Sequence, residues 1–311
     1  MTNDTIGVDI SKDHLDAHRM SDGESRRFAN DKAGHRAFVG WAGRCGARIV
    51  YEPTGPYHRA FERRLAEAGF ALVKVNPRQA RRFAEATGRL AKTDRLDAAM
   101  LARMGTLLDL EARPVRSPIL NDLKDLHMAR EALVKNRTAA KNRAKTLALV
   151  ILKRHNAEQL RQIERQMAAI EAEIKALIKS DPGLARRFDI LVSIPGVSTI
   201  TAFALIIDMP ELGTLENGQA ASLAGLAPVA RQSGQWTGRA FIRGGRANVR
   251  QALYMPALVA MRFNPNLKVK YDQLIAVGKA PKVAITAIMR RLVVLANALL
   301  RDGRKWAQNM P

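Results

Sequence analysis

The pattern of hydrophobic residues changes once along this chain, near Pro118, and that change limits its fold more than any other feature. Before Pro118, apolar runs of strand length lie at residues 5–10, 47–52 and 71–75, and helical patterns separate the later ones. Strands that alternate with helices are typical of an α/β sheet domain. After Pro118 the patterns are helical. We therefore expect an α/β domain over residues 1–117, a helical coiled-coil segment over 118–182 and a mainly α-helical domain over 183–311.

Two features of the helical part are more specific. The first is a heptad seam that ends at the sequence D-P-G, which begins with Asp181. The seam consists of Leu160, Ile163, Met167, Ile170, Ile174 and Leu177. The seam fits a helix pair within one chain as well as a contact between copies. Further along, L-V-S-I-P-G-V-S-T-I at 191–200 is similar to a helix-hairpin-helix, whose turn offers backbone N–H groups to a phosphate.

The charge of the chain favours a polyanionic partner. In 311 residues there are 51 Lys and Arg against 29 Asp and Glu, a formal net charge of +22. Nucleic acid ranks ahead of a membrane surface, because the basic residues are spread through the chain and do not form one amphipathic helix. Two sections lack acidic residues, 132–157 and 217–271. There we expect basic side chains to contact phosphates, and the alternative is a basic face that is only solvated. The residues concerned are Arg137, Lys141, Lys145, Arg231, Arg239, Arg243, Arg246 and Arg250.

The sequence favours a cytoplasmic protein without a membrane partner. The most apolar C-terminal run, 283–300, carries Arg290 and Arg291 at its centre, where a bilayer would be unfavourable. The N-terminus has neither the basic nor the apolar segment of a secretory signal. The single cysteine, Cys45, excludes an intrachain disulfide and fits a reducing compartment.

Four carboxylates stand out in this basic chain: Asp9, Glu52, Asp94 and Asp97. Asp9 lies inside an apolar strand, Glu52 ends another, and Asp94 and Asp97 share one face of a predicted helix that Thr93 opens. Such acids would repel one another unless divalent cations such as Mg²⁺ or Mn²⁺, which prefer oxygen ligands, joined them. Two such ions would serve phosphodiester chemistry. Taken singly, the acids also fit a strand end, a salt bridge with arginine and a helix cap.

Several short motifs, taken in order, resemble a known family. They are G-V-D-I-S-K, Y-E-P-T-G, K-T-D-R-L-D-A, I-P-G-V-S, A-G-L-A-P, R-Q-S-G and G-G-R-A-N-V-R-Q-A-L-Y-M. Their combination resembles the transposases of the insertion-sequence 110 family, which are related to Piv-type DNA invertases, over nearly the whole chain. The resemblance implies a RuvC-like, RNase H-type N-terminal domain that binds Mg²⁺ through four acids. By motif, these are Asp9, Glu52, Asp94 and Asp97.

The resemblance also implies a nucleophile, Ser233 in R-Q-S-G-Q, which joins covalently to DNA. A hydroxyl beside Gly234 on a predicted loop would be accessible, and Arg231 and Arg239 would hold a phosphate. From its surroundings alone, Ser233 fits an ordinary loop serine better. Tyr254 lies in an apolar helical setting, for which we expect core packing.

The partners implied by the resemblance are target and donor DNA, a structured guide RNA and further copies of the chain, as a dimer or tetramer. Two other functions remain open on the sequence. One is an RNase H-fold resolvase or endonuclease that uses water as its nucleophile. The other is a nucleic-acid binder without enzymatic activity.

Overall fold

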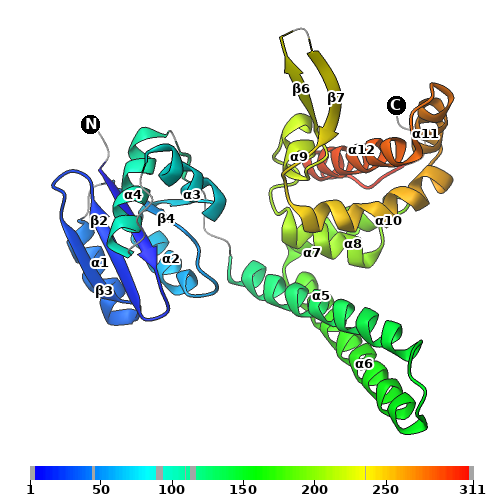
Figure 1. Cartoon of the computed structure of the whole chain (residues 1–311), viewed down its shortest axis with the longest axis horizontal. Coiled ribbons are helices and arrows are strands. Elements are labelled where there is room, and N and C mark those ends of the chain that lie inside the picture. The colour runs from blue at the N-terminus through cyan, green and yellow to red at the C-terminus, as the bar shows by residue number, and fades with distance from the viewer. Residues whose placement is uncertain are drawn as a thin grey trace. The chain divides into compact units, whose positions relative to one another are not determined.

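The computed structural model describes residues 4–43, 46–88, 94–108, 110–112, 117–234 and 236–307, without the side chains of residues 94–96, 236 and 239. The chain divides into two compact units, Met1–Arg116 (unit 1) and Ser117–Pro311 (unit 2) (Figure 1). The segment predicted at 118–182 and the domain predicted at 183–311 both fall in unit 2.

Unit 1 contains a five-stranded mixed sheet with the spatial order β3-β2-β1-β4-β5. Its strands are β1 (Thr5–Ile10), β2 (His14–Arg19), β3 (Ser25–Ala29), β4 (Arg48–Tyr51) and β5 (Ala71–Lys74). β1, β4 and β5 are parallel, whereas β2 is antiparallel to both β1 and β3. The expected α/β architecture is confirmed, although the sequence did not indicate β3.

Helices cover both faces of this sheet. The first face carries α1 (Lys32–Ala42) and α2 (His58–Glu67), whose Phe38, Phe61 and Leu65 are buried with residues of β1 and β4. The second face carries α3 (Pro77–Ala86) and α4 (Asp94–Leu107), which pack on Val50 and Val73. Residues of alternate parity in β4 therefore enter different cores, as the twofold repeat of a strand requires.

Two glycines bring β1 and α4 into close contact. A Cβ added at Gly7 would lie 2.0 Å from the backbone oxygen of Ala98 and 2.3 Å from the backbone nitrogen of Ala102. A Cβ added at Gly105 would lie 2.4 Å from Val50 Cγ2 and 2.9 Å from Thr5 Cγ2. Strand and helix therefore approach at a distance that no larger residue would permit.

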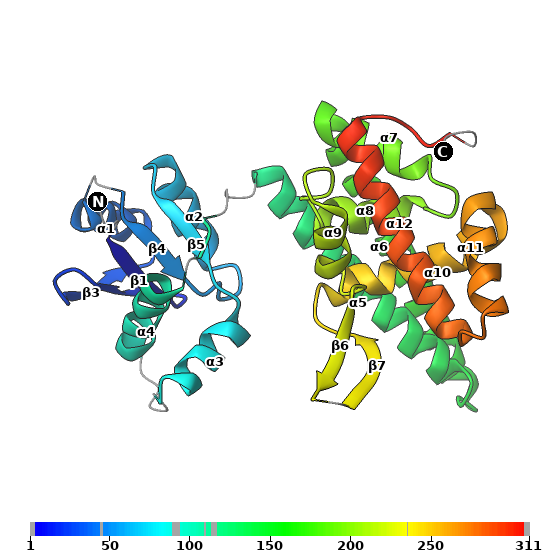
Figure 2. The ribbon, with the colours of Figure 1, turned by 90° about the horizontal axis from the view of Figure 1, so that it is seen from above.

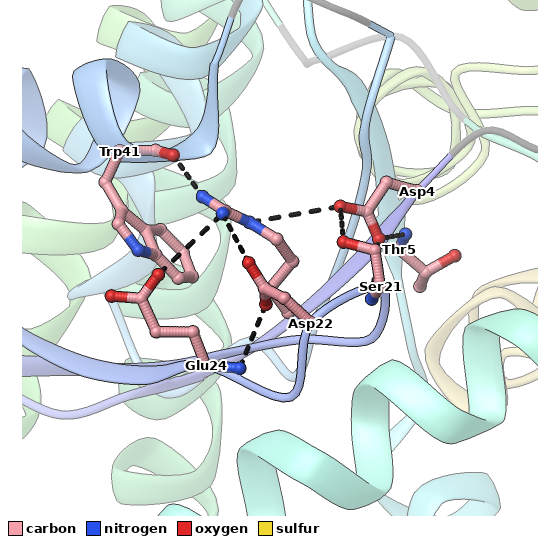
Figure 3. Close-up of polar contacts among 7 residues, drawn as sticks. Asp4, Thr5, Ser21, Asp22, Glu24 and Trp41 are labelled. Atoms are coloured by element: carbon pink, nitrogen blue, oxygen red, sulfur yellow. Dashed lines mark hydrogen bonds and ion pairs between the residues drawn. The ribbon is translucent and has the colours of Figure 1, made fainter.

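Arg19 ties together the elements around the start of β1. Its guanidinium donates to Asp22, at 2.9 Å, and to the backbone oxygen of Trp41, and it stacks on the Trp41 ring at 4.3 Å. Figure 3 shows these groups together with Asp4, which accepts a 2.7 Å hydrogen bond from Ser21. The contacts hold the β2–β3 turn against the start of β1 and the end of α1.

Unit 2 is mainly helical, as expected. Its helices are α5 (Pro118–Ala144), α6 (Val150–Ser180), α7 (Pro182–Val192), α8 (Thr199–Asp208), α9 (Asn217–Leu223), α10 (Ala247–Phe263), α11 (Pro265–Ala276) and α12 (Pro281–Asp302). Local signals set several boundaries: Asp181 and Asn264 cap α7 and α11, each followed by proline, and Gly303 ends α12 in the left-handed conformation. The sequence did not indicate an antiparallel hairpin of β6 (Pro228–Ser233) and β7 (Trp236–Ile242).

The predicted heptad seam lies within one chain. Helix α6 runs beside α5 (Figure 1), and Ile163, Met167 and Ile174 are buried. The buried Asn156 amide donates to the backbone oxygen of Ala140 at 3.1 Å across this pair. Of the two arrangements left open by the sequence, the seam therefore serves a helix pair inside the chain.

The turn predicted as a helix-hairpin-helix joins α7 to α8 and packs against α10. Gly196 has φ +96°, and a Cβ there would lie 2.8 Å from the backbone oxygen of Pro256. Ser198 caps α8 by accepting from the backbone N–H of Thr201 at 3.3 Å. Phosphate binding at this turn stays a prediction.

Helix α12 lies in the core of unit 2. It is long and apolar enough to cross a membrane by length and composition alone, but half of its most apolar window is buried. Ile288, Leu292 and Val293 are among the residues that it contributes to the core. Its hydrophobicity therefore has an explanation in core packing, and it gives no clear membrane signal.

A buried charged cluster joins α5 to the end of α8. Asp208 is only 5% exposed and pairs with Lys124 and, at 3.5 Å, with His127. Burial acts to raise the pKa of Asp208, but the interactions with His127 and Lys124 outweigh it and hold the pKa below its usual value. The carboxylate is therefore stabilised in its charged form.

Candidate active site

Asp9 and Glu52 lie level on neighbouring parallel strands. Val8 of β1 pairs with Tyr51 of β4, and Asp9 and Glu52 are the next residues along the chain. Both side chains are half-buried at the carboxyl end of the central strands. In an open α/β sheet this is the edge where functional groups gather.

The sheet face shared by these acids follows from the alternation of β1 and β4. Gly7 and Val50 face α4, and they form a cross-strand pair. Asp9 and Glu52 each lie two residues further on, so continued alternation brings them to the same face. The acids therefore belong to the side of the sheet that α3 and α4 cover.

The first turn of α4 reaches the same edge. Gly105 lies beside Thr5, and Ala98 and Ala102 lie over Gly7, so α4 runs antiparallel to β1. Continuing this register by one more turn brings the start of α4, with Asp97, to the level of Asp9. Asp94 is the first residue of the helix, and its side chain and Thr93 lie outside the described residues. The positive end of the helix dipole favours carboxylates there.

A fifth acid, which sequence reasoning missed, stands beside Asp9. Asp16 of β2 pairs with Asp9 in the β1–β2 ladder, and Arg27 of β3 pairs with Asp16 in the next. Arg27 donates two hydrogen bonds to the Asp16 carboxylate, of 2.9 and 3.0 Å. One row therefore crosses the sheet from the end of β4 to β3 and consists of Glu52, Asp9, Asp16 and Arg27. Arg27 neutralises Asp16 through two parallel hydrogen bonds. Only the strand register reveals this row.

A second polar cluster supports the strand end from the opposite face. Lys74 bonds to the buried Glu62 at 2.8 Å, and His58 Nε2 lies 3.4 Å from the same carboxylate. Burial lowers the pKa of His58, and Lys74 adds to the effect. Burial, and then the charge of Glu62, raise the pKa of Tyr51. These groups bracket the loop that follows Glu52.

Ser233 is the last residue of β6, at the tip of the β6–β7 hairpin, which we call the arm. Sequence reasoning placed Ser233 on a loop, whereas it ends a strand, where it pairs with Trp236. Gly234 has φ +55°, which a tight two-residue turn of this kind needs. Every residue of β6 is exposed, and the arm extends away from the helices in both views (Figures 1 and 2).

Comparison with known families identifies the chain. Residues 6–152 match a model of the IS110 DEDD domain, described as Transposase. Residues 188–272 match a second model, described as Transposase IS116/IS110/IS902 family. The chain belongs to the IS110 family of transposases. The match to the DEDD domain covers the unit that carries the four acids and continues into unit 2 as far as residue 152. The mixed sheet of unit 1 is consistent with such a domain.

Relatives of this transposase include DNA-inverting proteins. It is 27% identical to the Pilin gene-inverting protein of Moraxella bovis, across 98% of each chain. The protein of the same name from Moraxella lacunata gives the same values. The Insertion element IS110 uncharacterized 43.6 kDa protein of Streptomyces coelicolor is 31% identical over 50% of this chain and 38% of that one. The transposase is thus a recombinase enzyme with DNA as its substrate.

The DEDD domain of the transposase indicates dependence on a divalent metal ion. Within the described residues, which leave out the Asp94 side chain, no three His, Cys, Asp or Glu form a group that could hold an ion. Asp9, Glu52 and Asp97 each have other interactions. Their carboxylate oxygens are the donors that a hard cation prefers.

The basic residues predicted to bind phosphate differ in how far they are available for it. Arg246 is occupied inside unit 2, where it pairs with Glu211 at 2.6 Å and donates to the backbone oxygen of Asp208. Arg250 donates to the backbone oxygen of Gly244 at 2.9 Å. Arg137 is half-buried, whereas the exposed members are Lys141, Lys145, Arg231 and Arg243. The Arg239 side chain lies outside the described residues.

Tyr254 differs from expectation. It is 44% exposed on α10, although its neighbour Leu253 is fully buried. One residue turns a helix by about 100°, so adjacent residues face different surroundings. The prediction of core packing for Tyr254 was therefore wrong.

Proposed function

We propose that this transposase cuts and rejoins DNA with Ser233 as its nucleophile and with Mg²⁺ held by Asp9, Glu52, Asp94 and Asp97. One observation carries the proposal: the strand ends with Asp9 and Glu52 and the first turn of α4 meet at one sheet edge. The strand order β3-β2-β1-β4-β5, in which only β2 runs antiparallel to the other four strands, supports a RuvC-like, RNase H-type domain. Mn²⁺ would bind the same oxygen ligands.

Divalent ions held by the four acids would supply positive charge to a phosphate and would lower the pKa of an oxygen nucleophile. Asp9 and Glu52 would approach such an ion from the strands, and Asp94 and Asp97 from α4. Asp16 is not assigned to it, because Arg27 already neutralises that carboxylate.

Ser233 acts in two steps. Its Oγ attacks phosphorus, so that an Oγ–P bond forms while the bond from phosphorus to one deoxyribose oxygen breaks. The serine proton passes to solvent, and the departing oxygen takes up a proton. A hydroxyl of another DNA end then attacks the phosphoserine, which joins the strands and restores the serine.

The partners follow from the resemblance and from exposed surfaces. We propose a cytoplasmic homo-oligomer, a dimer or tetramer, that acts on target and donor DNA with a structured guide RNA. At the tip of the α5–α6 pair, Leu149, Val150, Ile151 and Leu152 are each more than 40% exposed, which supports a contact with a second copy. Lys141 and Lys145, for which the sequence predicts phosphate contacts, lie exposed nearby.

The Ser233→Ala variant tests the nucleophile in a plasmid carrying the element and its flanking DNA. We expect the parent, but not the variant, to give a covalent protein–DNA adduct on a denaturing gel and joined products by sequencing. Ser222→Ala, which removes an exposed serine hydroxyl on α9, should keep both. Joined products from Ser233→Ala, with no adduct from the parent, would point to water as the nucleophile.

The Asp9→Asn variant tests the metal site in the same assay. We expect it to lose cleavage, as removal of divalent ions should, because one anionic ligand is gone. Asp13→Asn, at an exposed position of the β1–β2 turn, is the matched control and should keep cleavage. If cleavage persists both in Asp9→Asn and in the presence of a chelator, neither this acid nor a divalent ion is needed for cleavage.

A further inference from the structure

The arm has two distinct faces. In β6, Val229, Arg231 and Ser233 alternate onto one face, and Gln232 lies on the other. Val229 pairs with Phe241, Arg231 with Gly238 and Gln232 with Thr237, with a bulge between the first two pairs. The Arg231 guanidinium lies 5.7 Å from the Phe241 ring centre, which agrees with this assignment. We call the first the serine face and the second the glutamine face.

Nothing within the described part of unit 2 covers the arm. β6 is exposed throughout, and Val229, Phe241 and Ile242 are 42%, 36% and 37% exposed. A two-stranded hairpin without a covered face is marginally stable in water. Such an arm gains order when a partner packs on it.

The charge of the arm selects a polyanion as that partner. No acidic residue occurs from 217 to 271, and the arm and its end carry Arg231, Arg239 and Arg243. Arg231 and Ser233 lie two residues apart on one face, about 7 Å along the strand. An arginine in that position would contact the phosphate that the serine attacks, or its neighbour.

The shape of the arm favours a DNA duplex over an RNA duplex. The major groove of B-form DNA admits a two-stranded ribbon, whereas that of A-form RNA is too narrow for side chains to read. Because Ser233, the last residue of β6, pairs with Trp236, the first residue of β7, the two strands stay paired up to the tip of the arm. The glutamine face, with Gln232 and Thr237, offers hydrogen-bonding groups that suit base edges.

We propose that the arm enters the major groove of the DNA duplex beside the cleaved bond. Its serine face follows the phosphates through Arg231, and its glutamine face contacts base edges through Gln232. The proposal rests on the proposed function in one respect, since Ser233 as nucleophile fixes which face meets the cleaved strand. Binding in the groove itself does not require catalysis.

Binding experiments on the full chain test this inference without catalysis. The parent is the Ser233→Ala protein, and the probes are a labelled DNA duplex and an RNA duplex of the same sequence. In this background, Arg231→Ala should weaken DNA binding and lower the slope of log affinity against log salt by about one. RNA duplex binding should stay unchanged. Arg301→Ala, at an exposed site on α12, is the matched control and should bind DNA as the parent does.

Two further measurements complete the test. Hydrogen exchange of residues 228–242 should slow when the DNA duplex is added, and Gln232→Ala should reduce the preference among DNA duplexes of different sequence. Unchanged DNA binding and exchange in these variants would overturn the inference, and a loss confined to RNA would assign the arm to RNA. Because Ser233 is absent throughout, a failure here differs from a failure of the serine mechanism, which the adduct assay reports.

Discussion

Gly7 lies where β1 passes under α4, and its missing side chain permits their contact. Gly7→Ala should destabilise unit 1 by about 1–3 kcal/mol, because the new methyl meets backbone atoms of Ala98 and Ala102 that cannot rotate away. Urea unfolding measures the change. Gly40→Ala is the control: its Cβ meets nothing within 4 Å in α1, so it should stabilise by about 0.5–1 kcal/mol. Equal effects at both positions would contradict the close contact.

His58 makes the stability of unit 1 depend on pH. Burial lowers the pKa of His58 below 6.5, so the unfolded chain binds a proton more readily than the folded one. The contribution of the neutral, buried His58 to the free energy of unfolding is complete above pH 6.5 and is lost as pH falls below it. The free energy of unfolding should therefore decrease from pH 7 to 5, and His58→Gln should flatten this decrease. His14→Gln, at an exposed position of β2, should leave the slope unchanged.

At the scale of elements, the cluster at Asp208 fixes α5 to α8. Asp208→Asn should destabilise unit 2 by about 3 kcal/mol, because Lys124 and the buried His127 lose their anionic partner. Thermal and urea unfolding report the change. Asp302→Asn removes a carboxylate that pairs with Arg301 and Arg304 at the surface, so it should change stability by less than about 0.5 kcal/mol. A similarly small effect at Asp208 would show that the buried pair is not needed.

Most elements could be predicted from the sequence where their signals are local. β1 and β4 are apolar runs, and α3, α7 and α11 begin with a capping residue followed by proline. The arm was missed because β6, P-V-A-R-Q-S, is exposed on both faces and has no apolar alternation. β3, S-R-R-F-A, is a polar edge strand with a single buried residue, Phe28.

The candidate site was predictable only in part, because some of its contacts join residues that no local sequence pattern connects. Asp9 and Glu52 follow apolar strands, and parallel strands bring their carboxyl ends to one edge, so their proximity could be expected. The bond of Arg27 to Asp16 depends on strand register. The pairing of Arg246 with Glu211 spans 35 residues, and no local pattern announces it, although it occupies an arginine that the sequence assigned to phosphate.

At the scale of the whole molecule, the two units have separate cores. The largest core cluster lies wholly in unit 2, and the clusters on the two sheet faces lie in unit 1. We expect two unfolding transitions, of which Gly7→Ala shifts one and Asp208→Asn the other. Fluorescence of Trp41 reports unit 1 and that of Trp306 reports unit 2, each measured with the other tryptophans changed to phenylalanine. A single transition that both variants shift equally would contradict this expectation.

The close contact of α4 with β1 fixes how far along the helix, and on which side of it, the acids of its first turn lie. Gly105 is locked beside Thr5 and Val50, and Asp97 stands eight residues before it, about 12 Å along the helix. One inserted residue between them would turn the acids by about 100° around the helix axis. Insertions and deletions in this stretch are therefore confined to those that preserve whole turns, whereas the segment before Asp94 is under no such restriction from the helix.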